Sequence, residues 1–299
     1  MDRAQTCKNQ EEYKISGFKI AVDQVQLQSS FPRLSGLRVL KSGGQKDVYA
    51  AESADYGPVV LKLMPIGPNG LSPRICREIE IVTSRTFTGV PRIFEQGTVS
   101  VGSVDAAFII EQRIEGRELR AILVDEGKQS KEFVVAMMKS LLATLCELEQ
   151  NRIVHRDIKP DNIVVDGEGK FWLLDFGIAR DLDAVSLTMT SEKMGPLSPG
   201  YAAPEQVMNF KRQIDTRSDL FSVGVTAYEL LAGRHPFAVA NANPLAVIVQ
   251  SVTTDVDTLD IDDDPKGELA AFVKTLMNKQ QTFRPPTAKM ALEWLNSIS

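Results

Sequence analysis

The chain has 299 residues, of which 43% are hydrophobic and 24% are charged, and its formal net charge is −5. These values are typical of a globular protein built as one large domain or two packed lobes. The acidic balance argues against general nucleic-acid binding, which requires Lys and Arg to neutralise phosphates. The three cysteines form no CxxC pair, no apolar run approaches the roughly 20 residues of a membrane span, and the first residues are polar. The sequence therefore predicts a cytoplasmic protein without a membrane segment.

The N-terminal part of the chain divides into an extension and a strand-rich region. Residues 1–33 show little periodicity apart from a candidate strand at 17–22, and we interpret them as an extension that packs on or regulates the rest. Between about residues 37 and 114, short apolar runs separated by turns predict strands that include 39–40, 48–50, 59–63 and 107–110. Apolar residues at helical spacing predict one helix among them, over residues 73–85.

Helices dominate from residue 119 onward. An apolar stripe of period 3.6 follows Ser130, a favourable N-cap, and predicts a long helix that reaches about residue 148. Further helices are expected over residues 218–232, where Gly233 ends the helix, from Pro265 onward, and over residues 287–298. A small sheet-rich lobe thus precedes a larger helical lobe, which gives an α+β fold.

The strongest chemical signal lies in the stretch His155-Arg156-Asp157-Ile158-Lys159-Pro160-Asp161-Asn162 and in Asp175-Phe176-Gly177. Phosphoryl transfer needs a carboxylate near the attacking hydroxyl, cations on the phosphates and ligands for those cations. Asp157 can accept the hydroxyl proton, and Lys159 can offset charge on the transferred group. Asn162 and Asp175 offer oxygen ligands that suit Mg²⁺. A hairpin of strands 162–165 and 171–174 would bring these two ligands together.

These stretches resemble the catalytic loop and the DFG motif of eukaryotic-like (Hanks-type) protein kinases, most closely the bacterial serine/threonine branch. The resemblance extends over residues 34–299 and implies a bilobal kinase domain. Its N-lobe, at about 34–113, would hold a small antiparallel sheet and one main helix, and its C-lobe, at about 114–299, would be mostly helical. The resemblance implies ATP and Mg²⁺, or Mn²⁺ in its place, as cofactors. It further implies that Lys62 holds the α- and β-phosphates and that Glu78 pairs with Lys62.

The phosphate-covering loop departs from the family pattern G-x-G-x-x-G-x-V, because lysines replace its first and third glycines. We expect ATP binding with a reshaped loop, in which the lysines bring positive charge near the phosphates. In the hinge, the resemblance puts Glu111 at the gatekeeper position and the backbone of residues 112–114 against adenine, whereas a shift by one residue would make Ile110 the gatekeeper. The implied nucleotide site comprises Lys41, Gly43, Gly44, Lys46, Val48, Val60, Lys62, Glu111, Arg113 and Val164.

The segment after the DFG motif ends at Ala203-Pro204-Glu205 and resembles the activation segment of the family. We expect its switching by phosphorylation of Thr188 or Thr190, in trans through self-association, with Arg156 binding the phosphate. Ser198 is expected to form a hydrogen bond near the catalytic aspartate. Two structural roles follow from the resemblance: Asp219 would brace the catalytic loop, and Arg284 would pair with Glu205.

Lys159 indicates the substrate class, because tyrosine kinases typically lack a lysine at that position. We therefore predict a serine/threonine kinase that acts on unidentified protein substrates and binds neither nucleic acid nor membranes. One alternative is a pseudokinase that serves as a nucleotide-sensing or scaffold module. The other is a small-molecule kinase of the aminoglycoside phosphotransferase type, although such enzymes lack the APE-ended segment and the Arg284 partner.

Overall fold

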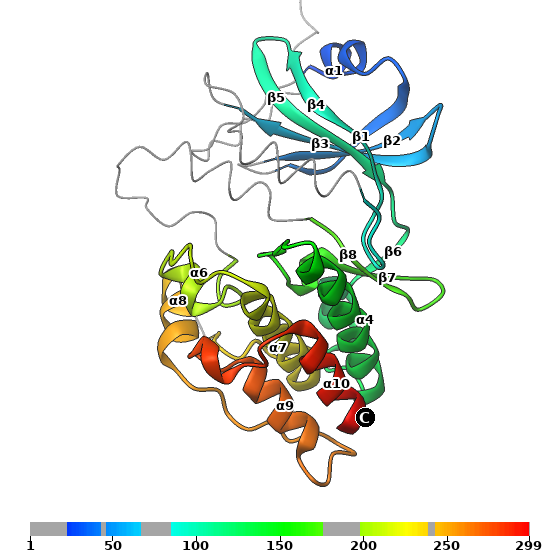
Figure 1. Ribbon diagram of the computed structural model, residues 1–299. Coiled ribbons are helices and arrows are strands. Elements are labelled where there is room, and N and C mark those ends of the chain that lie inside the picture. Colours follow the sequence, from blue (N-terminus) through cyan, green and yellow to red (C-terminus); the bar gives the residue numbers. More distant parts are fainter. Residues whose placement is uncertain (1–22, 43–45, 67–84, 176–197, 239–242, 299) are drawn as a thin grey trace, which may run out of the picture.

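The computed structural model describes residues 23–42, 46–66, 85–175, 198–238 and 243–298. Its described residues form two lobes, a smaller one built on a five-stranded sheet and a larger one that is mainly helical (Figure 1). This arrangement confirms the expected bilobal α+β fold. The predicted strand at 17–22 lies outside the described residues, and so does the predicted helix at 73–85 except for its last residue.

The smaller lobe is an antiparallel sheet with the strand order β1-β2-β3-β5-β4. Because side chains alternate across a strand, β3 presents Val59, Leu61 and Leu63 to one face, where they are fully buried in an apolar cluster. Val60 and Lys62 therefore lie on the opposite face. The strands are β1 (Leu34–Ser42), β2 (Asp47–Ser53), β3 (Gly57–Pro65), β4 (Ile93–Val101) and β5 (Val104–Gln112).

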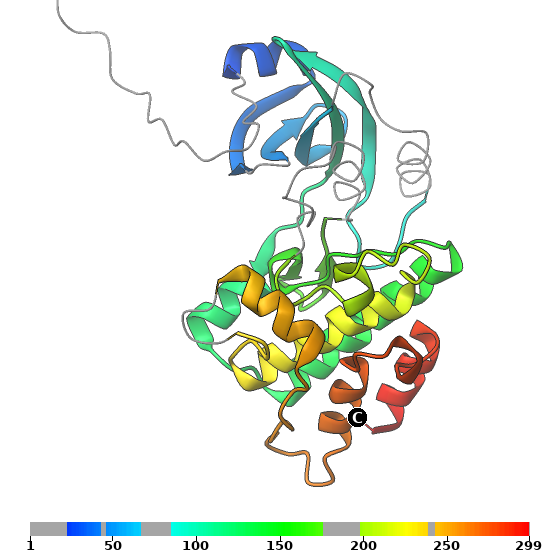
Figure 2. The ribbon, with the colours of Figure 1, turned by 90° about the vertical axis from the view of Figure 1, so that its left-hand side faces the viewer.

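A short helix, α1 (Gln24–Ser30), covers the apolar face of this sheet (Figures 1 and 2). The side chain of Asp23 caps it by accepting a hydrogen bond from the Val25 amide at 3.0 Å. Leu27 and Phe31 are buried in the apolar cluster, and the Phe31 ring meets the Phe108 ring edge to face with 5.2 Å between centroids. Residues 23–31, which the sequence assigned to an extension, thus complete the core of the smaller lobe.

The larger lobe is organised around α4 (Lys131–Gln150) and α7 (Thr216–Ala232), whose apolar side chains share one core. Figure 2 shows α10 against this pair at the C-terminal end of the chain. A small sheet on the side nearest the other lobe has the order β6-β7-β8. The remaining elements are β6 (Gly116–Glu118), α3 (Leu119–Glu126), η1 (Pro160–Asn162), β7 (Ile163–Asp166), β8 (Phe171–Leu173), α6 (Pro204–Val207), α8 (Pro244–Thr253), α9 (Glu268–Leu276), η2 (Gln281–Phe283) and α10 (Ala288–Ile298).

The helix boundaries agree with the sequence pattern in two cases and differ in a third. Ser130 caps α4 through the Phe133 amide, and Gly233 ends α7 with a left-handed φ of 67°. The prediction that a helix begins at Pro265 was wrong, because α9 begins at Glu268. The physical reason is the side chain of Asp264, which accepts hydrogen bonds from the Glu268 and Ala270 amides and so supports a turn before the helix.

Candidate functional site

A buried carboxylate on α7 holds the loop that carries the catalytic candidates. Asp219 accepts hydrogen bonds from the amides of His155 at 2.8 Å and Arg156 at 2.7 Å. Arg156 has a left-handed φ of 69°, a conformation that a non-glycine residue keeps only where its surroundings hold it. Burial raises the pKa of Asp219 to about 7, although both amides favour the charged form. The brace that the resemblance implies for Asp219 is therefore present as two hydrogen bonds to the main chain.

The hairpin of β7 and β8 brings the two metal-ligand candidates together. Ile163 pairs with Leu173, and beyond this register the Leu174 amide donates to the carbonyl of Asn162 at 2.8 Å. Asp175 follows Leu174 directly, with a left-handed φ of 60°. The predicted proximity of Asn162 and Asp175 is thus present at the level of the backbone.

Asp157 lies at the centre of a group of polar side chains. Its Oδ1 accepts a hydrogen bond from the hydroxyl of Ser198 at 2.8 Å, and its Oδ2 accepts one from the Asn162 amide nitrogen at 2.9 Å. The Nζ of Lys159 lies 3.2 Å from Asp157 Oδ2 and donates to Ser198 Oγ at 2.6 Å. The sequence anticipated the contact of Ser198. These four side chains can fix the orientation of a carboxylate and place an ammonium group beside it.

A row of side chains with alternating charge connects the smaller lobe with Asp175 of the larger lobe. The Nζ of Lys62, on β3, lies 2.6 Å from Glu111 Oε1 and 2.6 Å from Asp175 Oδ1. The Nζ of Lys46 lies 2.6 Å from Asp175 Oδ2. Each ion is therefore in contact with at least one ion of opposite sign.

The pKa values follow from burial and from these contacts. Burial alone would raise the pKa of the Asp175 carboxyl, but the ammonium groups of Lys62 and Lys46 hold it well below its ordinary value. Burial alone would lower the pKa of Lys62, but Asp175 and Glu111 raise it above its ordinary value. For Lys46, burial lowers the pKa despite the attraction of Asp175. Asp175 is therefore an anion and Lys62 a cation at neutral pH.

The donor atoms fit a hard divalent cation. The amide nitrogen of Asn162 is committed to Asp157, which leaves its Oδ1 as an acceptor, and the two oxygens of Asp175 already attract cationic groups. Mg²⁺ takes one or two protein ligands and completes its shell with water and phosphate oxygens. In the described part of the chain, no group of three or more His, Cys, Asp or Glu side chains is arranged to hold a metal ion.

The remaining candidates for the nucleotide site divide into described and undescribed residues. Val48 pairs with Lys62, and Val60 lies two residues before Lys62, so both share its face of the sheet. Val164 is buried on β7, Arg113 is half-buried, and Lys41 is exposed on β1 opposite Val48. The candidates that lie outside the described residues are Gly43, Gly44, Glu78, Thr188 and Thr190.

The register of β5 places the two gatekeeper candidates on opposite faces of the sheet. Ile110 is buried in the apolar cluster beneath α1, on the far side of the sheet from Lys62. Glu111 occupies the other face and reaches Lys62. Of the two residues, Glu111 is therefore the one that lies on the face of the charged site, and the gatekeeper role itself stays a prediction.

Two clusters of polar side chains, one fully buried and one partly buried, lie in the larger lobe. Arg284 forms a two-pronged ion pair with Glu205, with Nη1–Oε1 at 2.7 Å and Nη2–Oε2 at 3.1 Å. Sequence reasoning missed the second group, in which Arg120 contacts Glu229 at 2.8 Å, Tyr201 at 2.6 Å and Asp161 at 3.2 Å. The glutamate inside the apolar run of α7 was the available signal, since a buried charge is normally paired.

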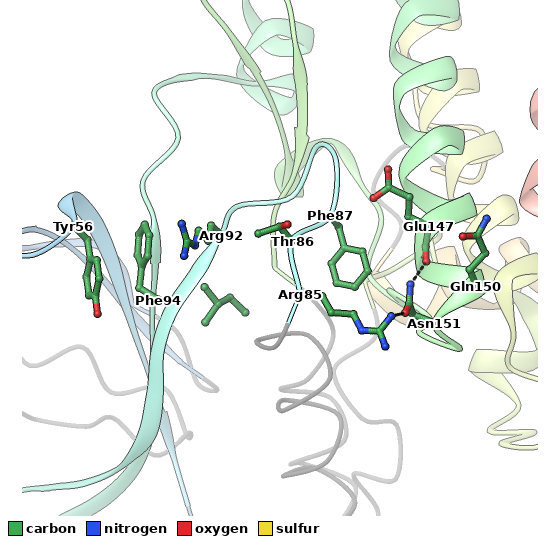
Figure 3. A pocket seen from close by; sticks show the side chains of 10 residues that line it. Tyr56, Arg85, Thr86, Phe87, Arg92, Phe94, Glu147, Gln150 and Asn151 are labelled. Atoms are coloured by element: carbon green, nitrogen blue, oxygen red, sulfur yellow. Dashed lines mark hydrogen bonds between the residues drawn. The ribbon is translucent and has the colours of Figure 1, made fainter.

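A separate hollow of about 660 Å³ lies between the start of β4 and the C-terminal end of α4 (Figure 3). Tyr56 and Phe94 stack on its wall with 4.5 Å between ring centroids, and Arg85 reaches toward Asn151 (Figure 3). It shares no residue with the charged site, and we assign no chemistry to it.

Comparisons with known proteins agree with this geometry. The family described as "Protein kinase domain" matches residues 37–295. The chain is 33% identical over 221 residues to the serine/threonine-protein kinase PknL of Mycobacterium tuberculosis, covering 73% of this chain and 53% of PknL. It is 30% identical over 223 residues to the serine/threonine-protein kinase PrkC of Bacillus subtilis, covering 72% of this chain and 33% of PrkC. The chain thus spans about half the length of PknL and a third of PrkC. Since the family match covers most of the sequence, the chain belongs to the protein kinase domain family.

Proposed function

We propose that this chain is an ATP-dependent serine/threonine protein kinase. One observation carries the proposal: Asp157, Lys159 and Asn162 form one hydrogen-bonded group, and Asn162 is tied through Leu174 to the segment that presents Asp175. Phosphoryl transfer depends mainly on positioning and on charge stabilisation, and this group supplies a base, a cation and two metal ligands in one place.

The proposed chemistry is divided among the side chains of the site. Asp157 accepts the proton of the attacking hydroxyl, and Asn162 and Ser198 hold its carboxylate in place for that purpose. Lys159 offsets negative charge on the transferred phosphoryl group. Asn162 and Asp175 would hold Mg²⁺, with Mn²⁺ as its substitute, and a bound divalent ion would neutralise phosphate charge. Lys62 and Lys46 would contact the phosphates from the smaller lobe.

The hinge backbone supports the predicted position of adenine. The Gln112 amide donates to the Arg92 carbonyl at 2.8 Å, and the Arg113 amide donates to the Pro58 carbonyl at 3.3 Å. These bonds fix the course of the segment from β5 to β6. They occupy the first two amides of the predicted hinge residues 112–114, so we assign the amide of Ile114 to the base as donor.

The substrate class is proposed from two indications. Lys159 is the residue that the serine/threonine branch carries, and its ammonium group lies beside Asp157. PknL and PrkC are both named serine/threonine-protein kinases. Proteins with serine or threonine hydroxyls are therefore the proposed substrates, and their identity is open.

Regulation and location are also proposals. We keep autophosphorylation at Thr188 or Thr190, in trans between two copies, as a prediction for residues outside the described ranges. We also keep the cytoplasm as the predicted compartment. None of the helices in the described ranges is long and apolar enough to cross a bilayer.

The direct test is transfer of labelled γ-phosphate from Mg-ATP to the chain itself and to a mixture of serine-, threonine- and tyrosine-containing peptides. Wild type should label serine or threonine, and Asp157→Asn should lose about two to four orders of magnitude in rate, the usual contribution of a general base. Asp262→Asn, an exposed aspartate that pairs with Lys128 among the described residues, is the control and should keep the wild-type rate. A folded wild type that labels nothing would favour the pseudokinase alternative.

A further inference from the structure

Glu111 and Lys62 are diagonal neighbours on one face of the sheet. In the antiparallel pairing of β3 and β5, Val60 lies opposite Glu111 and Lys62 lies opposite Ile109. Residues two apart on a strand share a face, so Lys62 and Glu111 project from the same side. Diagonal pairs are within reach of long side chains, and here the Lys62 Nζ and Glu111 Oε1 are 2.6 Å apart. The sheet itself therefore fixes this ion pair.

The Lys62–Glu111 pair is buried, so the cost of burying its charges bears on why Glu111 is acidic. Glu111 is 8% exposed and Lys62 is 7% exposed. Burial raises the pKa of Glu111, against the attraction of Lys62. A buried carboxylate is unfavourable unless an opposite charge or hydrogen-bond donors accompany it. An apolar side chain would avoid this cost at the end of β5, so the acidic residue needs a reason beyond stability.

Lys62 also contacts Asp175, whose proposed role is to bind the metal ion. Its ammonium group also contacts Asp175 Oδ1 at 2.6 Å, and Asp175 is a proposed metal ligand. A carboxylate engaged with a divalent cation has less charge to offer an ammonium group. The partner that the resemblance implies, Glu78, lies outside the described residues. Glu111 is therefore the described carboxylate that can stay on Lys62 while Asp175 serves a metal.

We propose that Glu111 is a positioning residue, which holds the ammonium group of Lys62 at the place where the α- and β-phosphates of the nucleotide bind. The inference rests on the proposed function, because it assumes that Lys62 contacts phosphates. Its distinctive content is that the anchor belongs to the same sheet as the lysine. The position of Lys62 then depends in part on the register of β3 with β5.

Whether removal of Glu111 weakens or strengthens phosphate binding distinguishes a positioning role from a purely electrostatic one. Glu111 adds a negative charge near the phosphates, so its removal would strengthen phosphate binding if charge alone mattered. If Glu111 holds Lys62 in place, its removal weakens phosphate binding, because the lysine must then be ordered when the nucleotide binds. A third role, a hydrogen bond from the adenine amine to Glu111, would change the affinity for adenosine as well.

The experiment is calorimetric titration of the full chain with Mg-ADP and with adenosine. Glu111→Gln keeps the shape of the side chain and removes its charge. We expect Mg-ADP affinity to fall about tenfold or more, as for the loss of a charge-assisted hydrogen bond, while adenosine affinity stays the same. Glu52→Gln, an exposed glutamate on β2 of the same sheet, is the matched control and should change neither.

A double-mutant cycle tests whether Glu111 acts through Lys62. In a Lys62→Met background, Glu111→Gln should produce no further loss of Mg-ADP affinity. The inference is overturned if Glu111→Gln leaves Mg-ADP affinity unchanged or raises it, if adenosine affinity falls equally, or if the loss persists without Lys62. If the glutamine variant does not fold, Glu111→Met replaces it, since an apolar side chain removes the buried charge altogether. A wild type that binds adenosine but not Mg-ADP would overturn the proposed function directly.

Discussion

The hydroxyl of Ser198 donates a hydrogen bond of 2.8 Å to Oδ1 of Asp157. The same hydroxyl accepts a hydrogen bond of 2.6 Å from Lys159. A single side chain from the end of the activation segment thus connects the proposed base with the proposed charge-neutralising cation. This contact makes the geometry of the catalytic loop depend on a segment that lies some forty residues further along the chain.

Ser198→Ala should lower kcat about tenfold, because it removes a hydrogen bond to the charged Asp157 carboxylate. The KM for ATP should remain near the wild-type value, since Ser198 acts on Asp157 and Lys159, whereas Lys62 and Asp175 are the proposed contacts of the phosphates and the metal. Ser198→Thr keeps the hydroxyl and should keep most of the activity. Steady-state kinetics with a peptide substrate measures both constants, and equal activity of the alanine and threonine variants would contradict the assigned contact.

In the proposed site Lys46 would compete with a metal ion for Asp175, because its Nζ lies 2.6 Å from Asp175 Oδ2. Lys46→Met should therefore shift half-maximal activity to a lower Mg²⁺ concentration by about fivefold, the factor that corresponds to about 1 kcal/mol for such an ion pair. Lys266→Met, at an exposed position before α9 in the larger lobe, serves as the control. Activity measured against Mg²⁺ at a fixed ATP concentration reports the shift. A higher Mg²⁺ requirement in the Lys46 variant would argue that the lysine assists the metal.

Glu205→Ala should destabilise the fold by about 3–5 kcal/mol, because it leaves the buried guanidinium of Arg284 without its partner. Ser218, which donates to Glu205 Oε1 at 2.6 Å, would lose its acceptor as well. Arg33→Ala breaks an exposed ion pair with Asp55 and should change the unfolding midpoint little. Urea unfolding followed by circular dichroism compares the two. Adding Arg284→Met to Glu205→Ala should recover part of the loss, and no recovery would show that the cost lies elsewhere.

His235 should make the fold sensitive to mild acid. Its ring lies between Tyr201 and Phe237, and burial lowers its pKa below 6.5, with Glu229 opposing and Arg120 adding to the shift. Below pH 6.5 the unfolded chain therefore binds more protons than the folded chain at this site, and the free energy of unfolding falls as the pH drops through the folded pKa.

The reference for this effect is His235→Asn, which can still accept the hydrogen bond that Nδ1 takes from the Phe237 amide at 3.1 Å. Wild type should be the more stable protein at pH 7.5, and its advantage should shrink between pH 6.5 and 5. Urea midpoints at several pH values measure the difference. An advantage that does not vary with pH would show that the histidine is not buried in its neutral form.

The sequence predicted the catalytic loop well because its chemistry is contiguous. Asp157, Lys159 and Asn162 lie within one short stretch, and the hairpin signal after it was strong enough to place Asp175 nearby. The long helices were predictable for a similar reason, since a cap and a repeating stripe are local patterns. Both kinds of inference need no knowledge of which distant segments meet.

The features that the sequence did not predict depend on contacts between segments that are distant in the sequence or on too few residues to form a pattern. The contact between Lys62 and Glu111 requires the register of β3 with β5, which the strand pattern alone does not give. The helix α1 has only Leu27 among its residues as a buried side chain, too few to produce a stripe. For α9, Pro265 predicted an earlier start, but the Asp264 side chain accepts hydrogen bonds from the Glu268 and Ala270 amides and supports a turn before the helix.

The hydrogen bonds from the main chain to Asp219 bear on which substitutions a chain of this kind can accept. Because the carboxylate accepts hydrogen bonds from two peptide amides, these bonds do not depend on the side chains at positions 155 and 156. The hydrogen bonds that position the catalytic loop are thus separate from the side chains that would carry out its reaction. Substitutions could silence the chemistry in a descendant while the architecture stays intact, so an unaltered shape in a related protein would be no guarantee that phosphate still moves.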